Sequence, residues 1–175
     1  MIAVVLDTET TGLPSSKYAQ PVSIGAVAVD TTTGVTVSEF YTLVRPTVIH
    51  FKEYMDAFRI HGIDLASLQE DGLYKDDAVI EFRDWWIGMA EKRPMLYAFN
   101  VSFDSVMLKR MGFDPKGYWG PCLMQTAARH LGRASGRVSL DRAAKTVGAA
   151  RQSGEHNALE DARLAATVGF ATGAW

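Results

Sequence analysis

The first ten residues constrain this chain more than any other stretch. Residues 2–6 form an apolar run, and because both faces of such a run are apolar, it predicts a strand buried within a sheet. Asp7 and Glu9 follow at its end, and side chains two positions apart on a strand point to the same side. Two carboxylates so placed lie within about 7 Å of each other and repel unless a cation sits between them. Taken alone, they would also fit a strand edge with solvated acids, so the rest of the chain must decide.

Length and composition limit what the chain can be. With 175 residues, 47% of them hydrophobic, it is long enough for one ordinary core and short for two, so we expect a single domain over residues 1–175. No apolar run approaches the roughly 20 residues of a membrane span, and the N-terminus lacks the basic start of a signal peptide. The single cysteine, Cys122, excludes an internal disulfide and a zinc site built on cysteines. We therefore expect a cytoplasmic protein without a membrane partner.

The net charge of −2 is not that of a protein that holds nucleic acid by bulk electrostatics. It permits an acidic site whose charge is offset by bound metal.

The order of the predicted elements indicates an α/β fold. Residues 22–30 and 35–45, separated by a Thr-Thr-Thr-Gly turn, predict an antiparallel hairpin. Further strands are expected at 95–100 and, as a short candidate, at 119–124. The predicted helices cover residues 53–59, 76–92, 101–111, 125–131, 139–147 and 156–166.

Three further polar residues lie at the start of predicted helices or within them. Asp104 falls in the first turn of helix 101–111, where the helix dipole favours an acid in any case. His156 lies just before the last helix or in its first turn, and Asp161 lies well inside that helix, beside a seam of small residues. An acid at such a seam is partly desolvated, and no salt-bridge partner for Asp161 is apparent in the sequence. Asp161 is therefore a candidate ligand.

Taken together, the candidate metal ligands are the four acids Asp7, Glu9, Asp104 and Asp161, with His156 as the fifth distinctive residue. Hard carboxylate oxygens in a site without cysteine point to Mg²⁺ or Mn²⁺. Four acids suit a pair of ions about 4 Å apart, the arrangement that clamps the attacking and leaving oxygens in phosphoryl displacement. A histidine beside such a pair has a pKa suited to taking a proton from the attacking water at neutral pH.

These residues also resemble a known family. The stretches Asp-x-Glu-Thr-Thr-Gly-Leu at 7–13, Asn-x-x-Phe-Asp at 100–104 and His-x-Ala-x-x-Asp-Ala at 156–162 are similar to the three motifs of the DEDD exonucleases. The histidine five residues before the last aspartate resembles the DEDDh branch, which includes the proofreading epsilon subunit of bacterial replicative polymerase, ribonuclease T and oligoribonuclease. The resemblance implies a ribonuclease-H-like fold, with a five-stranded mixed sheet and helices on both faces. It also implies a 3′→5′ exonuclease that uses two divalent metal ions and releases nucleoside 5′-monophosphates.

The resemblance implies a role for each motif residue. Asp7, Glu9 and Asp161 would bind the metal that activates water, and Asp7 would bridge to a second metal. Asp104 would act largely through water, and His156 would be the general base. The turn after the first strand would meet the terminal nucleotide, with Leu13 or a neighbour wedging against its base. The expected substrate contacts are Thr8, Thr10, Thr11, Gly12, Leu13, His61, Phe99, Asn100 and Phe103.

The substrate stays open at this stage. We favour the single-stranded 3′ end of DNA, with RNA or short oligoribonucleotides as the alternative, because no residue identifies a contact with a 2′-hydroxyl. Many relatives carry His-Asn where this chain has Phe99-Asn100, so Phe99 is a candidate for stacking on a base or sugar. A second alternative is a non-catalytic module that binds a polymerase or a nucleic-acid end; loss of an acid or of the histidine would favour it, and all five are present. A polymerase or replication complex, as in proofreading, and a homodimer are the protein partners considered.

Overall fold

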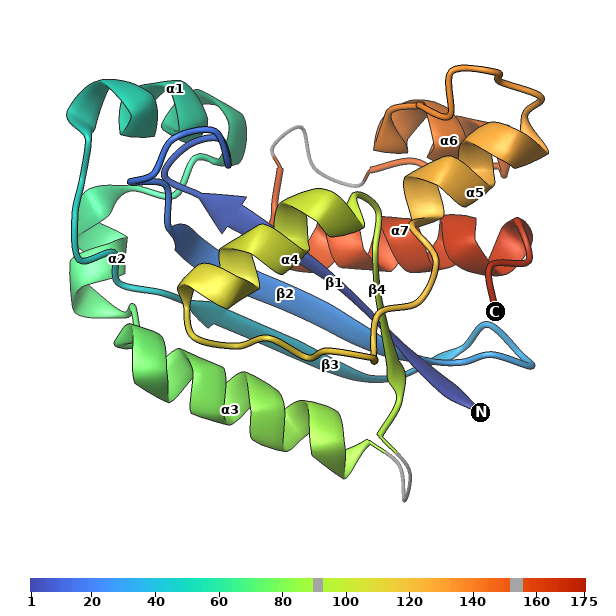
Figure 1. Cartoon of the computed structure of the whole chain (residues 1–175), viewed down its shortest axis with the longest axis horizontal. Helices are drawn as coiled ribbons and strands as arrows, with labels where there is room; N and C mark the ends of the chain where they lie inside the picture. Colours follow the sequence, from blue (N-terminus) through green and yellow to red (C-terminus); the bar gives the residue numbers. More distant parts are fainter. Residues whose placement is uncertain (90–92, 152–155) are drawn as a thin grey trace.

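The computed structural model describes residues 1–89, 93–151 and 156–175, which form a mixed β-sheet with helices on both faces (Figure 1). The predicted α/β fold is confirmed. No helix within these ranges combines the length and the apolarity that crossing a bilayer requires. In chain order, the elements are β1 (Ile2–Thr10), β2 (Pro21–Asp30), β3 (Thr36–Leu43), α1 (Phe51–His61), α2 (Leu65–Glu70), α3 (Lys75–Gly88), β4 (Met95–Ala98), α4 (Val101–Arg110), α5 (Leu123–His130), α6 (Leu140–Thr146) and α7 (Ala158–Ala171).

Strand β1 lies inside the sheet, which explains its apolar run. The strand order is β3-β2-β1-β4, with β2 antiparallel to β1 and β3, and β4 parallel to β1. β1 continues past Leu6 to Thr10, so Asp7 and Glu9 lie within its C-terminal part, not just beyond it. Asp7 pairs in register with Gly25 of β2. Because Gly25 has no side chain, a helix can approach the two acids closely at this position.

Alternate side chains of the sheet pack against two different helical layers. Val5 and Val27 belong to the core that includes α5, α6 and α7. Val4 and Leu6 belong to the core that includes α3 and α4. Because apolar side chains are buried on both faces, the central strands lack the polar–apolar alternation of a sheet with one face in water.

The predicted fifth strand at residues 119–124 is wrong. Leu96 of β4 donates its N–H to the Tyr118 carbonyl at 2.7 Å and accepts from the Gly120 N–H at 2.8 Å, and this forms only an isolated bridge. Pro121 has no N–H with which to extend the ladder, and α5 begins at Leu123. Among the described residues, the sheet therefore has four strands and not five.

The segment between β3 and β4 holds one helix that the sequence did not predict. This helix, α2, is short, and Asp64 caps it by accepting a hydrogen bond from the Ser67 N–H at 2.9 Å. α1 ends at His61 because Gly62 adopts a left-handed conformation with φ of 67°. The glycine after His61 is thus the end of a helix.

Candidate active site

Four carboxylates converge at the C-terminal end of β1. Asp7 and Glu9 come from β1 itself, Asp104 from the first turn of α4, and Asp161 from the first turn of α7. Glu9, Asp104 and Asp161 are only 9%, 2% and 5% exposed. Because β1 and β4 are parallel neighbours, their C-terminal ends meet at one edge of the sheet, and α4 starts directly after β4 at this edge. The fold thus brings together the four acids that the sequence singled out.

A glycine in β2 lets α7 reach these acids. Gly25 lies opposite Asp7, and a Cβ added there would stand 2.1 Å from the Leu159 nitrogen and 2.2 Å from the Ala158 carbonyl carbon. The backbone of the first turn of α7 therefore rests directly on β2. Asn157 begins the helix by accepting hydrogen bonds from the N–H groups of Leu159 and Glu160. Asp161 lies in the first turn and not well inside the helix, contrary to the sequence prediction.

Burial raises the pKa values of three of the acids, and repulsion by neighbouring carboxylates adds to this for Asp7 and Glu9. For Glu9, desolvation raises the pKa to about 7, the charge of Asp104 adds to this, and Arg151 opposes it. Burial likewise raises the pKa of Asp104 to about 7, although Thr8 donates a hydrogen bond to its Oδ1 at 2.9 Å and acts in the opposite direction. Burial, followed by the charges of Asp104 and Glu9, holds the pKa of Asp7 well above its usual value. Positive charge beside the cluster is therefore needed to keep all of these carboxylates ionised at neutral pH.

Arg151 is a member of the site that the sequence analysis missed. Its side chain is 10% exposed, pairs with Asp161, and donates from Nη2 to Asp141 Oδ1 at 3.1 Å. The prediction that Asp161 lacks a salt-bridge partner is wrong. The only signal in the sequence was a basic residue five positions before His156, in a loop that appeared merely polar.

His156 lies beside Asp161. Its Nδ1 is 3.1 Å from Asp161 Oδ2, and its backbone N–H donates to the Ile60 carbonyl at 3.2 Å. Desolvation and then the charge of Arg151 lower the pKa of His156. The imidazole is therefore neutral at neutral pH, and the pairing of Nδ1 with Asp161 leaves Nε2 as the nitrogen that can accept a proton.

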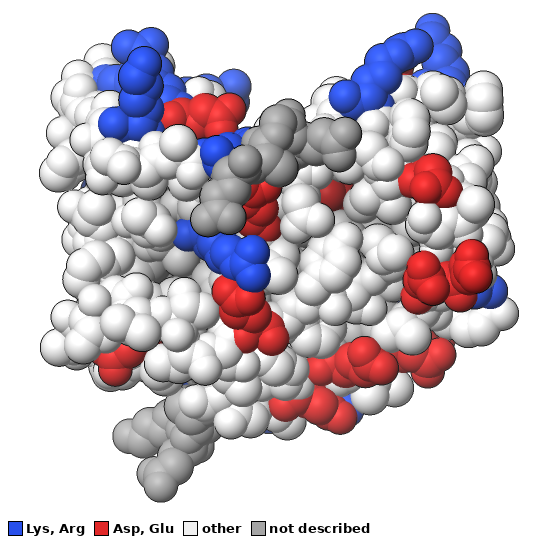
Figure 2. All heavy atoms as spheres, turned by 180° about the vertical axis from the view of Figure 1, so that it is seen from behind, with Lys and Arg blue, Asp and Glu red and all other residues white. Residues whose placement is uncertain are grey.

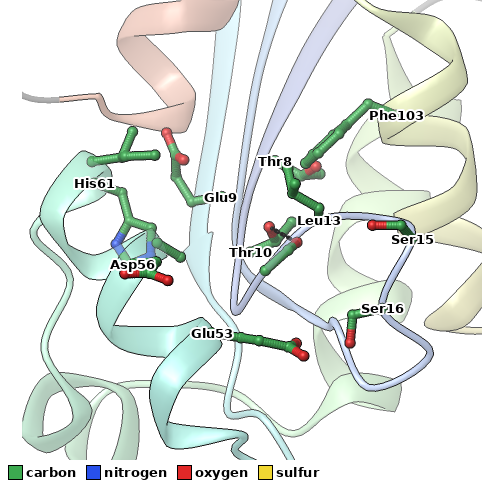
Figure 3. A pocket seen from close by; sticks show the side chains of 13 residues that line it. Thr8, Glu9, Thr10, Leu13, Ser15, Ser16, Glu53, Asp56, His61 and Phe103 are labelled. Atoms are coloured by element: carbon green, nitrogen blue, oxygen red, sulfur yellow. Dashed lines mark hydrogen bonds between the residues drawn. The ribbon is translucent and has the colours of Figure 1, made fainter.

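A pocket of about 510 Å³ opens next to Glu9 (Figure 3). Figure 3 shows Thr8, Phe103 and Leu13 on one side of it and His61 and Asp56 of α1 on the other. Six of its lining residues are predicted substrate contacts, namely Thr8, Thr10, Gly12, Leu13, His61 and Phe103. Six further lining residues were not predicted from the sequence, namely Ser15, Ser16, Glu53, Asp56, Ala57 and Ile60.

Three predicted substrate contacts lie outside this pocket. Thr11 is buried, and its Oγ1 accepts a hydrogen bond from the Gln20 N–H at 3.0 Å. Phe99 is 8% exposed and packs in the core beneath α5 and α7, so its side chain presents little surface on which a base could stack. Asn100 lines a different groove, on the far side of the first turn of α4.

His61 borders the pocket from below the surface. It is 5% exposed, and its Nδ1 accepts a hydrogen bond from the Ile63 N–H at 3.0 Å, so Nε2 carries the proton of the neutral ring. Burial lowers the pKa of His61. A neutral His61 shapes the pocket wall without adding charge to it.

The comparison with known families decides the class of this site. A family model described as Exonuclease (RNase_T) matches residues 4–168, which include all four acids and His156. The chain belongs to the DEDDh family of 3′–5′ exonucleases. The alternative of a non-catalytic module is therefore not retained.

Relatives of this exonuclease agree with the assignment. The 3′–5′ DNA exonuclease Cap18 of Escherichia coli is 28% identical over 177 residues, which cover 95% of this chain and 89% of that protein. The structure of Exonuclease X in complex with 5′ overhanging duplex DNA is 26% identical, with a TM-score of 0.72 over 97% of this chain and 90% of that one. The nuclease domain of 3′hExo, a DEDDh family member bound to rAMP, has a TM-score of 0.79 at 13% identity over 97% and 90% of the two chains, and so shows the shared fold.

DEDDh exonucleases use divalent metal ions, and the residues of this exonuclease fit them. Ligand atoms of Glu9, His156 and Asp161 lie within 4.8 Å of one another. Among the described residues, Glu9 Oε1 is buried without a hydrogen-bond partner. Such an oxygen is costly to bury unless a ligand satisfies it. A bound divalent cation would favour the ionised form of these carboxylates and so offset their raised pKa values.

The raised carboxyl pKa values predict that the metal-free exonuclease loses stability as the pH rises from about 4.5 to 7. In this window the unfolded chain has released the Glu9 proton, whose usual pKa is 4.5, whereas the folded chain retains it up to about pH 7. The loss from Glu9 alone should be about 3 kcal/mol, at about 1.4 kcal/mol for each unit of pKa, and should level off above pH 7. Thermal unfolding in EDTA at a series of pH values measures it, and added Mg²⁺ or Mn²⁺ should abolish the loss.

The matched control is Glu9→Gln, which cannot ionise and should lose this part of the pH dependence. The lowered pKa of His156 gives the opposite slope just below pH 6.5, and subtracting the two proteins removes it. Equal pH profiles for the two metal-free proteins would contradict the assignment of a raised pKa to Glu9.

Proposed function

We propose that this exonuclease removes nucleoside 5′-monophosphates from the single-stranded 3′ end of DNA with two Mg²⁺ or Mn²⁺ ions. The observation that carries the proposal is the pairing of a buried four-carboxylate cluster with a pocket of nucleotide size, with Glu9 belonging to both. Leu13, 69% exposed, stands at the pocket with an apolar side chain suited to wedging against a base. A base that contacts such a wedge must be unstacked, which favours a single strand.

DNA is favoured over RNA on the names of the relatives. Cap18 is named a DNA exonuclease, and the Exonuclease X structure contains duplex DNA with a 5′ overhang. The 3′hExo structure with rAMP keeps RNA as the second candidate, at lower sequence identity. A polymerase or replication partner, a homodimer and a cytoplasmic location stay predictions.

In the proposed reaction, His156 Nε2 takes the proton of the attacking water while Asp161 Oδ2, at 3.1 Å from Nδ1, steadies the imidazolium that forms. Asp7, Glu9, Asp104 and Asp161 would hold the two ions, which supply positive charge to the phosphate oxygens and lower the pKa of the water. The water oxygen bonds to phosphorus as the bond from phosphorus to the 3′-oxygen of the preceding nucleotide breaks. That 3′-oxygen takes up a proton from solvent, and the terminal nucleotide leaves with its 5′-phosphate. Thr8 fixes the carboxylate of Asp104 in this arrangement.

The test is digestion of matched 5′-labelled single strands of DNA and RNA with Mg²⁺ or Mn²⁺. We expect a ladder that shortens from the 3′ end, faster on DNA, and that disappears in EDTA or with Asp7→Asn. His156→Ala should retain metal binding while losing most of the rate, which isothermal calorimetry and single-turnover assays separate. A wild-type protein that shortens neither strand with either ion would refute the proposal, and a faster RNA ladder would transfer it to RNA.

A further inference from the structure

A second groove lies on the other side of the first turn of α4. It has a volume of about 800 Å³, and its walls include Asn100 and Ser102 at the start of α4, Gln125 and Arg129 of α5, and Arg137 of the loop after α5. These five side chains end in amide, hydroxyl or guanidinium groups, and Val101, Cys122 and Met124 add apolar surface to the same groove. None of these five residues lines the pocket beside Glu9.

The wall formed by α5 and its following loop is basic. Residues 115–140 contain no Asp or Glu but include Lys116, Arg129, Arg133 and Arg137, in a chain whose net charge is −2. Arg129 and Arg137 are exposed. Within the described residues, neither they nor Arg133 form an ion pair with a carboxylate. Figure 2, which shows the molecule from behind, has Lys and Arg side chains at both upper corners and most Asp and Glu side chains lower on the molecule. Arg129 donates a hydrogen bond to Thr126 Oγ1 at 3.2 Å, but no carboxylate of the described residues neutralises the guanidinium group of Arg129 or of Arg137. Such groups are suited to phosphate oxygens, which they bind in a bidentate fork.

The groove and the nucleotide pocket flank the same turn of backbone. Phe103 lines the pocket and Ser102 lines the groove, and the catalytic candidate Asp104 follows them in the same turn. α5 is fixed to this turn because the Met124 N–H donates to the Phe99 carbonyl at 2.8 Å, and Cys122 Sγ contacts the same oxygen at 3.2 Å. The arginine wall is thus held in a set position relative to the carboxylate cluster.

We propose that this groove binds the sugar–phosphate backbone of the strand upstream of the nucleotide being removed, with Arg129 and Arg137 paired to its phosphates. The inference rests on the proposed function, which places the 3′-terminal nucleotide in the pocket beside Glu9. The rest of the strand must then run from the carboxylate cluster in a direction that leads away from the pocket. The groove on the other side of the α4 turn offers positive charge in this direction. The contacts are to phosphates, so they add affinity without base specificity.

The expected result is a dependence on strand length. Arg129→Ala combined with Arg137→Ala should raise KM roughly tenfold or more on a single strand of about ten nucleotides, because two charge-assisted contacts are lost. Its kcat should stay unchanged, and so should kcat/KM on a dinucleotide, which is too short to occupy the groove. The logarithmic dependence of affinity on salt should become shallower by about 1.4, at about 0.7 for each phosphate contact on a single strand.

The matched control is Lys75→Ala combined with Arg83→Ala on α3, which removes the same charge from side chains of similar type that are 45% and 49% exposed. It should leave KM for the long strand unchanged. Arg129→Lys combined with Arg137→Lys should recover part of the affinity, because the charge is kept and the fork is lost. An unchanged KM for the long strand, or an equal loss on the dinucleotide, would overturn the proposal.

Binding without turnover separates this inference from the proposed function. In the Asp7→Asn background, fluorescence anisotropy of a labelled strand should show the same weakening of Kd for the alanine pair as the KM measurement. If the wild-type protein digests no strand yet the arginine pair still sets Kd, the proposed function fails and the groove stands. If digestion proceeds and Kd does not depend on the arginines, only the groove fails.

Discussion

Gly25→Ala should destabilise the protein by at least about 3 kcal/mol and should lower exonuclease activity more than 100-fold even where the chain remains folded. The added Cβ would stand 2.1–2.5 Å from backbone atoms of Ala158 and Leu159, and backbone cannot rotate away as a side chain can. The first turn of α7 would have to withdraw from β2. That movement would carry Asp161 and His156 away from Asp7 and Glu9. Asp161 lies in the first turn of α7, and His156 lies just before the helix. Chemical denaturation gives the loss of stability, and single-turnover digestion gives the loss of rate.

Gly88→Ala is the matched control. Gly88 lies at the C-terminal end of α3, and a Cβ added there meets nothing within 4 Å. The same chemical change should be neutral or stabilise the protein by up to about 1 kcal/mol, because alanine is the better helix former. If Gly25→Ala bound Mn²⁺ and cut DNA as the wild type does, α7 would not need its close approach to β2, and this account of the site would be wrong.

The sequence was informative wherever the chemistry of one residue sufficed. The apolar run before Asp7 predicted a buried strand, because only a strand covered on both faces tolerates such a run. The carboxylates of Glu9 at the end of a predicted strand and Asp104 at the start of a predicted helix were identified as candidate metal ligands from residue type and position. These predictions depend on side-chain periodicity and on residue type, both of which are local properties of the sequence.

The errors arose where tertiary contacts decide. The stretch 119–124 has strand-forming residues, but Pro121 ends its pairing with Leu96, and the hydrogen bond from Met124 to Phe99 starts a helix. The role of Gly25 depends on α7, which lies more than 130 residues later in the chain, so no pattern near Gly25 could indicate it. The same applies to Arg151, whose partners Asp141 and Asp161 lie ten residues away on either side, on two different helices.

Arg151→Gln should destabilise the metal-free protein by about 3 kcal/mol and the metal-bound protein by much less. Arg151 is 10% exposed, and its guanidinium pairs with Asp161, contacts Asp141 and lowers the pKa values of Asp7 and Glu9. Removing it leaves a buried cluster of acids without a compensating charge, which is the costly way to break a buried ion pair. When divalent ions are bound, they supply that charge instead. Thermal unfolding in EDTA and in Mn²⁺ should therefore show a larger stabilisation by metal in the variant than in the wild type.

The same variant should bind the metal more tightly. Arg151 must release Asp161 before that carboxylate can hold an ion. The free energy with which Arg151 stabilises the metal-free state is therefore subtracted, by thermodynamic linkage, from the free energy of metal binding. A difference of about 3 kcal/mol between the two states corresponds to roughly a 100-fold lower Kd for Mn²⁺, which calorimetry on the free protein measures. Asp141→Asn is the matched control, because it removes the second partner of Arg151 but keeps the guanidinium charge beside Asp161. An equal loss of stability with and without metal, and an unchanged Kd, would instead make Arg151 a tether between α6 and α7 with no part in the charge balance of the site.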